Sequence, residues 1–228
     1  MTFAIVARHP ATGEFGVAKA TRTIAAGGLD LYRHVPMMGL CLAISTVSRC
    51  HKVGAVMIKN GLGAEYAMRT MIRSDEYIAN RQLAAIDSLG KVSAYTGEDC
   101  YPYAGHIVGD NYVVLGNVLT GVSTIESMAA SYEQSSELPF AQRLIASLTA
   151  GRDAGGQLGG QRSSDMSIFG NREGALIDLR IDLSDDPIAE LARLYEIFSP
   201  LQPYYELHRL QPRGLPRADE WLKQQGLT

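Results

Sequence analysis

The chain has 228 residues, of which 46% are hydrophobic and 20% are charged, and its formal charge at pH 7 is -3. This length suffices for one large hydrophobic core and is short for two full domains. A slightly negative chain without clustered Lys and Arg argues against a nucleic-acid partner. The longest apolar stretch, residues 37–44, is far shorter than a membrane span, so we expect a soluble, cytoplasmic protein without membrane contact.

Two short apolar runs, residues 3–7 and 15–20, open the chain and are predicted to form a β-hairpin. Thr2 then stands at the start of the first strand, directly after Met1. If Met1 is removed, Thr2 carries a hydroxyl and a free α-amine on one residue. Because an α-amine titrates near ~8, its neutral form can act as the base for that hydroxyl.

Short strands and helices follow in chain order. Residues 23–34 read as a loop, and later strands are predicted at 37–46, 82–86, 91–96, 106–108, 112–115, 163–169 and 175–183. Helices are predicted at 51–59, 64–73, 122–132, 138–150 and 186–198, and a short one at 219–225. This order indicates an α+β fold with much antiparallel pairing.

Two polar segments at predicted strand ends are candidate pocket walls. The string 45–51, which includes Ser45, Ser48 and His51, follows a strand that is apolar throughout; it is equally well read as an ordinary strand-to-helix loop. Asn117 ends another strand beside Gly116, and its amide could stabilise an oxyanion. A turn or helix cap explains Asn117 equally well.

The three cysteines and five histidines are scattered singly along the chain. Widely spaced cysteines in odd number are typical of reduced thiols and not of a disulfide framework. A metal site would need His, Cys or carboxylates at short repeating spacings. We therefore expect neither a metal site nor a cofactor.

Several motifs resemble a bacterial family of uncharacterised proteins, domain of unknown function 1028 (DUF1028), over about residues 1–197. They are TFAIVAR at 2–8, PATGEFGVA at 10–18, Arg81-Gln82, AGH at 104–106, GNVLTG at 116–121, DLRID at 178–182 and DPIAEL at 186–191. The family is placed in the N-terminal-nucleophile (Ntn) hydrolase superfamily. The resemblance implies a four-layer αββα sandwich, in which two antiparallel sheets lie between helical layers.

The resemblance also implies a mechanism: Thr2 attacks an amide bond in a small N-acyl or peptide-like substrate. Asn117 would hold the oxyanion, and Lys19 or Arg22 would tune the amine or pair with a substrate carboxylate. Ser45, Ser48 and His51 would line the substrate pocket. Lys19 and the 45–51 segment depart from the family pattern, which leaves the substrate class open.

Two other readings stay open at this stage. If Met1 is retained, the Thr2 nitrogen is an amide and cannot act as a base, and the protein would then be a non-catalytic metabolite-binding or assembly protein with the same fold. Alternatively, Cys50 or Ser48 serves as the nucleophile.

The predicted fold occupies residues 1–198, and residues 199–228 form a C-terminal extension in which prolines interrupt any long helix. We expect this extension to pack on the core or on a partner subunit. Together with the glycine-rich segment 151–160, it offers surface with no evident role within one chain, so we expect a homo-oligomer.

Overall fold

The computed structural model describes residues 1–45 and 48–227. Thr46, the last residue of the predicted strand 37–46, and Val47 lie outside the described residues, as does Thr228; Thr46 and Val47 both belong to the polar string 45–51.

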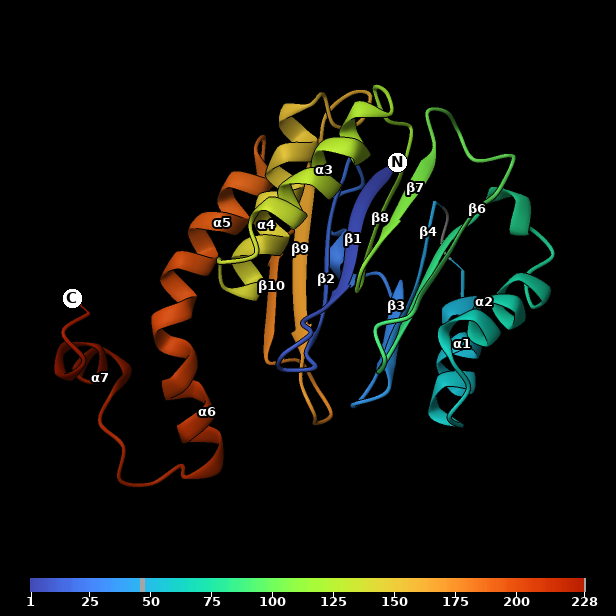
Figure 1. The fold of residues 1–228 in the computed structure, drawn as a ribbon. Coiled ribbons are helices and arrows are strands. Elements are labelled where there is room, and N and C mark those ends of the chain that lie inside the picture. The colour runs from blue at the N-terminus through green and yellow to red at the C-terminus, as the bar shows by residue number, and fades with distance from the viewer. Residues whose placement is uncertain (46–47, 228) are drawn as a thin grey trace.

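Two antiparallel sheets form the centre of the molecule (Figure 1). The six-stranded sheet has the order β10-β9-β2-β1-β8-β7, and the four-stranded sheet has the order β3-β4-β5-β6. The strands are β1 (Thr2–Arg8), β2 (Phe15–Thr21), β3 (Tyr32–Val35), β4 (Gly39–Ile44), β5 (Gln82–Asp87), β6 (Val92–Thr96), β7 (Gly105–Gly109), β8 (Tyr112–Asn117), β9 (Ser163–Phe169) and β10 (Ile177–Ile181).

Helices cover the outer face of each sheet (Figure 1). Helices α3 (Ser123–Gln134), α4 (Phe140–Asp153) and α5 (Pro187–Phe198) pack on the six-stranded sheet, and α1 (Cys50–Lys59) and α2 (Ala64–Arg73) pack on the four-stranded sheet. The predicted four-layer αββα sandwich is confirmed. Within the described part of the chain, every helix is too short or too polar to span a bilayer.

Strand β1 shows why the sheets pack on both faces. Phe3 and Ile5 lie in the core beneath the helices, whereas Ala4 and Val6 lie in the core between the sheets. Successive side chains of a strand point to opposite faces, so a strand that is apolar throughout is buried on both sides. All residues of β1 from Thr2 to Ala7 are accordingly buried.

Strand β3 overlaps the segment 23–34 that the sequence predicted as a loop, so that prediction was wrong for residues 32–34. β3 is an edge strand that pairs with β4 alone, and its Arg33 is exposed. An edge strand with charged and polar residues lacks the apolar pattern by which strands are identified.

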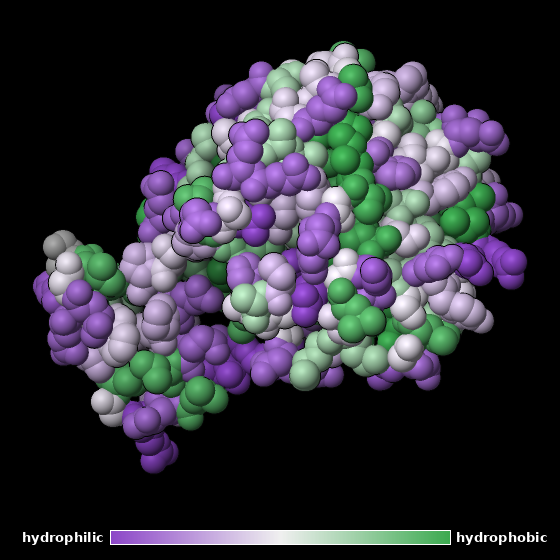
Figure 2. All heavy atoms as spheres, in the orientation of Figure 1, coloured by the Kyte–Doolittle hydropathy of each residue, from purple (hydrophilic) through white to green (hydrophobic). Residues whose placement is uncertain are grey.

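The C-terminal extension contains α6 (Gln202–Leu210) and α7 (Ala218–Gln224), neither of which has a buried residue. Pro203 is accommodated in the first turn of α6, where a missing N–H costs nothing. The extension leads away from the sandwich (Figure 1) and forms a lobe with apolar and polar surface (Figure 2). Its predicted packing on a partner subunit stays a prediction.

The space between the sheets is closed at one end by three aromatic rings. The His34 ring stacks on Phe169 with ring centroids 4.6 Å apart, and the Phe15 ring lies 5.7 Å from it. Burial lowers the pKa of His34 to about 4, and its Nε2 atom has no hydrogen-bond partner among the described residues. His34 is therefore neutral in the folded protein near pH 7.

We predict that His34 makes the protein sensitive to acid. Its pKa is about 4 when folded and ~6.5 when unfolded. As the pH falls below 6.5, the unfolded state therefore binds a proton before the folded state does. The free energy of unfolding decreases between pH 6.5 and 4, and the decrease is about 2–3 kcal/mol at pH 4.5. Urea unfolding at pH 7 and 4.5 should show a smaller difference for His34→Phe than for wild type. His208→Phe, a change in exposed α6, should leave the difference unchanged; an equal reduction there would contradict the assignment.

Candidate functional site

A row of polar side chains crosses the six-stranded sheet at the start of β1. Thr2 pairs with Thr21 of β2 on one side and with Asn117 of β8 on the other, and Thr21 pairs with Ser163 of β9. All four residues are buried. Thr2 shares its side of β1 with Ala4, which packs between the sheets, so this row faces the four-stranded sheet.

The hydroxyl of Thr2 takes part in a short chain of hydrogen bonds. Thr2 Oγ1 donates to Thr21 Oγ1 over 3.2 Å, and Thr21 Oγ1 donates in turn to the carbonyl oxygen of Met1. The Thr2 residue is 8% exposed, whereas Met1, which precedes it, is 42% exposed. The row thus holds the Thr2 hydroxyl in one place.

Two pockets meet at Met1. The smaller, of about 270 Å³, is lined by Met1, Thr2, Lys19 and Ser45, among others. The larger, of about 800 Å³, is lined by Met1, Ser45 and Asn117 together with mostly apolar and aromatic residues. Met1 and Ser45 belong to both linings. The structure therefore brings Thr2, Lys19 and Asn117 around the first residue of the chain.

Lys19 lies two residues from Thr21 on the same side of β2 and forms a buried ion pair with Asp165 of β9. Neither side chain is more than 2% exposed. The Lys19 ammonium also lies 5.3 Å from the centre of the Tyr32 ring. Burial raises the pKa of Asp165, and the nearby Lys19 cation opposes this shift. One carboxylate oxygen of Asp165 has no partner among the described residues.

Asn117 is held from the opposite sheet by Gln82, the first residue of β5. The Asn117 amide donates to Gln82 Oε1 over 2.8 Å, and the Gln82 amide donates to the Gly116 carbonyl, also over 2.8 Å. Gln82 is fully buried and also reaches Gly105 and Thr96. Because one of the two amide hydrogens of Asn117 points at Gln82, the other is left for a further acceptor.

The backbone beside the pockets is strained at two residues. Ser45 has φ 85° and Val118, which directly follows Asn117, has φ 56°. Positive φ is unfavourable for residues other than glycine, and most of all for a β-branched residue such as Val118. Strain of this kind concentrates at functional sites, where the surrounding structure enforces it. Both residues line the larger pocket.

The other predicted substrate-binding residues lie outside these two linings. Arg22 is exposed and donates to the Gly159 carbonyl. Ser48 donates to Asp75 over 2.5 Å in a neighbouring hollow of about 360 Å³. His51 is fully buried, with its Nε2 atom 3.5 Å from Asp30. Burial lowers the pKa of His51, and Asp30 opposes that shift. Their roles stay predictions.

Cys50, the alternative nucleophile, is 4% exposed. Burial raises the pKa of its thiol, although a hydrogen bond with Ser48 acts in the opposite direction. A reactive cysteine needs a lowered pKa and access to solvent. The surroundings of Cys50 therefore favour an inert thiol. Among the residues that the structure describes, no group of three His, Cys, Asp or Glu side chains could hold a metal ion.

Sequence reasoning missed Asp165 and Gln82. Asp165 lies inside the predicted strand 163–169 and was a usable signal, because a carboxylate that becomes buried in a strand requires a partner. Gln82 lies in one of the motifs that resemble DUF1028, but nothing in the motif names Asn117 as its partner. Both residues act through contacts between distant segments.

We predict that Lys19 and Asp165 are coupled. Lys19→Met should lower the free energy of unfolding by about 3–5 kcal/mol, because it leaves a buried carboxylate unpaired. The double variant Lys19→Met/Asp165→Leu should lose less than Lys19→Met alone. Arg69→Ala, which breaks an exposed pair with Glu65, should cost less than about 1 kcal/mol. Urea unfolding of wild type and the three variants measures this, and a double variant as unstable as Lys19→Met or less stable would contradict the coupling.

We further predict that Gln82 joins the two sheets at this site. In the variant Gln82→Leu the side-chain volume is similar, but the Gly116 carbonyl and the Asn117 amide lose their partner. The free energy of unfolding, measured in urea, should fall by on the order of 2–4 kcal/mol. The control Gln142→Leu, on the exposed side of α4, should stay within about 0.5 kcal/mol of wild type. Equal effects of both changes would refute a special role for Gln82.

The chain is similar to known proteins in both sequence and fold. A crystal structure of protein SPO2555 from Silicibacter pomeroyi, also described as DUF1028, has a TM-score of 0.79 and 30% identity, covering 87% of this chain and 86% of that chain. Eukaryotic HslV from Trypanosoma brucei reaches a TM-score of 0.38 and 11% identity, covering 74% of this chain and 99% of that chain, which is too weak to argue from. No curated protein matches. The model of the family of unknown function DUF1028 matches residues 2–191, and the chain belongs to this family.

Proposed function

We propose that this chain is an amide hydrolase of the Ntn type, in which Thr2 becomes the nucleophile once Met1 is removed. The observation that carries the proposal is the meeting of two pockets at Met1, with Thr2 and Lys19 in one and Asn117 in the other. Loss of Met1 would join the pockets and uncover the amine and the hydroxyl of Thr2 at their junction.

The reaction would proceed through an ester on Thr2. The Thr2 hydroxyl oxygen attacks the amide carbonyl while the α-amine of Thr2 takes the hydroxyl proton. The tetrahedral oxyanion then collapses, the C–N bond breaks, and the α-ammonium returns the proton to the leaving amine. Water, deprotonated by the same α-amine, hydrolyses the ester, which releases the acid and restores Thr2.

The surroundings of the chain start would favour a neutral amine, the form that can act as a base. Burial lowers the pKa of the Met1 α-amine, and a Thr2 amine exposed one residue further on would enter similar surroundings. Lys19 adds positive charge to the lining that it shares with Thr2, and a nearby cation also favours the neutral amine. The pairing with Asp165 keeps the Lys19 ammonium in position.

Asn117 is suited to stabilise the oxyanion. Its register with Thr2 places the two residues side by side across β8 and β1. Gln82 fixes the amide through one hydrogen, and the second hydrogen is left for a substrate oxygen. A donor that is held before the substrate arrives contributes roughly 3 kcal/mol to transition-state stabilisation.

The larger pocket suggests the kind of acyl group that the enzyme would accept. Tyr77, Tyr101 and Val118 contribute to its lining, and its size of about 800 Å³ suits a small molecule. The two charged residues of the lining, Arg81 and Asp99, are opposite in sign, and Arg81 Nε is paired with Asp75 over 2.9 Å. An uncharged N-acyl or peptide-like group would fit this chemistry.

One observation favours a second candidate, a non-catalytic protein that binds a small metabolite. Thr2 is 8% exposed, and its nitrogen is an amide if Met1 is retained. The larger pocket would then bind its ligand without chemistry on the threonine.

We predict that activity appears on removal of Met1 and depends on the Thr2 hydroxyl. Purified protein would be treated with methionine aminopeptidase, checked by intact mass, and assayed on fluorogenic N-acyl amides and small peptides. Processed wild type should hydrolyse at least one substrate, processed Thr2→Ser should retain part of the activity, and processed Thr2→Ala should lose it by 10³-fold or more. Thr12→Ala, in an exposed turn, should match wild type.

Equal activity before and after removal of Met1, or an active Thr2→Ala, would refute the proposed nucleophile. Binding of a substrate analogue in the larger pocket without turnover by fully processed protein would favour the second candidate.

A further inference from the structure

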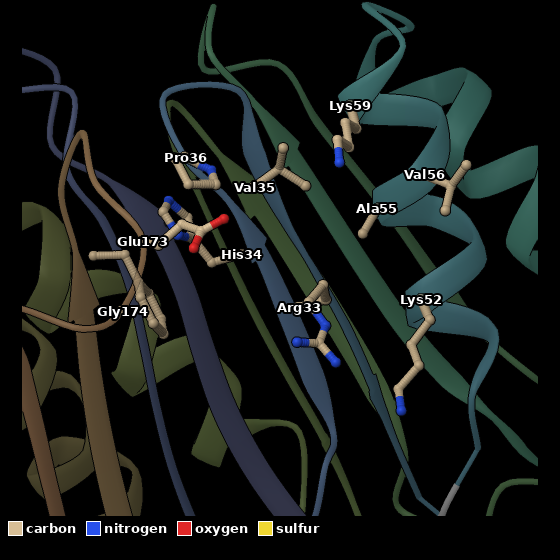
Figure 3. A pocket seen from close by; sticks show the side chains of 11 residues that line it. Arg33, His34, Val35, Pro36, Lys52, Ala55, Val56, Lys59, Glu173 and Gly174 are labelled. Carbon is tan, nitrogen blue, oxygen red and sulfur yellow. The ribbon is translucent and has the colours of Figure 1, made fainter.

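A further pocket, of about 680 Å³, lies between strand β3, helix α1 and the turn that follows β9 (Figure 3). It is at the opposite end of the sandwich from Thr2. Arg8 at the far end of β1 pairs with Phe15, which pairs with Phe169 beside this pocket. Six residues of strand separate Arg8 from Thr2, a distance of about 20 Å.

The outer edge of β3 is free for pairing. β3 pairs with β4 alone. The Leu31 carbonyl accepts from the Ala43 amide over 2.8 Å, so the backbone groups of Leu31 point toward β4. The N–H and C=O groups of successive residues in a strand point in alternate directions. The backbone groups of Arg33 therefore also point toward β4, whereas those of Tyr32 and His34 point outward. Among the described residues these outward groups have no hydrogen-bond partner.

Cationic side chains border this free edge on the α1 side. Figure 3 shows Arg33 reaching from β3, and Lys52 and Lys59 from α1. Lys52 is paired with Asp30, and Arg33 lies 3.9 Å from the same carboxylate. Lys59 is exposed and has no ion-pair partner within the described residues. The α1 side of the edge therefore attracts negative charge.

The other side of the edge has different chemistry. His34 and Phe169 present stacked rings there, and Glu173 lies at the rim. A negative group on this side would meet the Glu173 carboxylate, whereas an apolar side chain would contact the rings. The two sides together select a ligand with negative groups on one face and apolar groups on the other.

An extended peptide meets these requirements better than a small anion. Lys52 and Lys59 are seven residues apart on α1, about 10 Å along the helix, so their ammonium groups can contact separate acidic side chains of one extended segment. A β-strand places alternate side chains on opposite faces, and its backbone can bond to the free groups of Tyr32 and His34. Pairing of β3 with β3 of a second copy would bring like charges together.

We propose that β3 and α1 form a docking site for an extended segment of a partner protein in which acidic and apolar residues alternate. The segment adds a strand to the edge of the four-stranded sheet. Its acidic side chains contact Arg33, Lys52 and Lys59, and its apolar side chains contact His34 and Phe169. This site is independent of the chemistry proposed at Thr2.

The test uses a fluorescein-labelled hexapeptide that alternates Glu with Val and Phe, titrated against the full chain by fluorescence anisotropy. Arg33→Gln and Lys59→Gln should each weaken binding five-fold or more. Lys91→Gln, which removes an exposed lysine outside the pocket, should change binding less than two-fold. Thr2→Ala should bind as wild type does, which separates this site from the proposed hydrolase.

Amide hydrogen exchange by NMR then reports the strand pairing. The amides of Tyr32 and His34 should gain protection when the peptide binds, whereas the amide of Arg33, which faces β4, should change little. Two further peptides are N-methylated, one on the Glu residues and the other on the Val and Phe residues, and the one whose methyl groups face β3 should bind at least ten-fold more weakly, because alternate N–H groups of a strand face its partner.

Three results would overturn the proposal. The first is an absence of peptide binding at low salt. The second is unaltered binding of both N-methylated peptides, because strand pairing needs one of the two sets of N–H groups. The third is displacement of the peptide by pyrophosphate at equal concentration, which would indicate a small-anion site.

Discussion

The candidate site depends on the pairing of strand β1 on both of its edges. β1 lies between β2 and β8, and this pairing places Thr2 beside Thr21 and Asn117. A shift of one residue in register would turn Phe3 and Ile5 out of the core beneath the helices and into the space between the sheets. The position of Thr2 is therefore set by the burial of side chains that take no part in chemistry.

Buried polar groups near Thr2 are stable because each has a partner from another segment. Burial of Lys19 alone would be costly, but Asp165 pairs with it. The Asn117 amide donates a hydrogen bond to Gln82, which lies in the opposite sheet. Such networks hold side chains in one arrangement, which a site needs if its groups are to be in place before a ligand arrives. The contact between Gln82 and Asn117 also connects the two sheets at this end of the sandwich.

The two ends of the sandwich differ in character. At the start of β1 the sheets enclose polar residues and two pockets that meet at Met1. At the other end the rings of Phe15, His34 and Phe169 close the apolar core, and beyond them lies the free edge of β3 with its cationic border. One scaffold can thus support a reaction at one end and association at the other, because the apolar core separates them.

The sequence by itself determined the opening hairpin, the place of Thr2 at its start, most strands and helices, and, through the motifs shared with DUF1028, the αββα sandwich. These follow from apolar periodicity and turn residues, which act over a few neighbouring positions. Only the tertiary structure decided that residues 32–35 form an edge strand, that Lys19 pairs with Asp165, 146 residues away, and that Asn117 is held by Gln82. The physical reason is that a buried polar group takes its partner from whichever segment the packing of the sheets brings within hydrogen-bond distance, and local sequence carries no record of that segment.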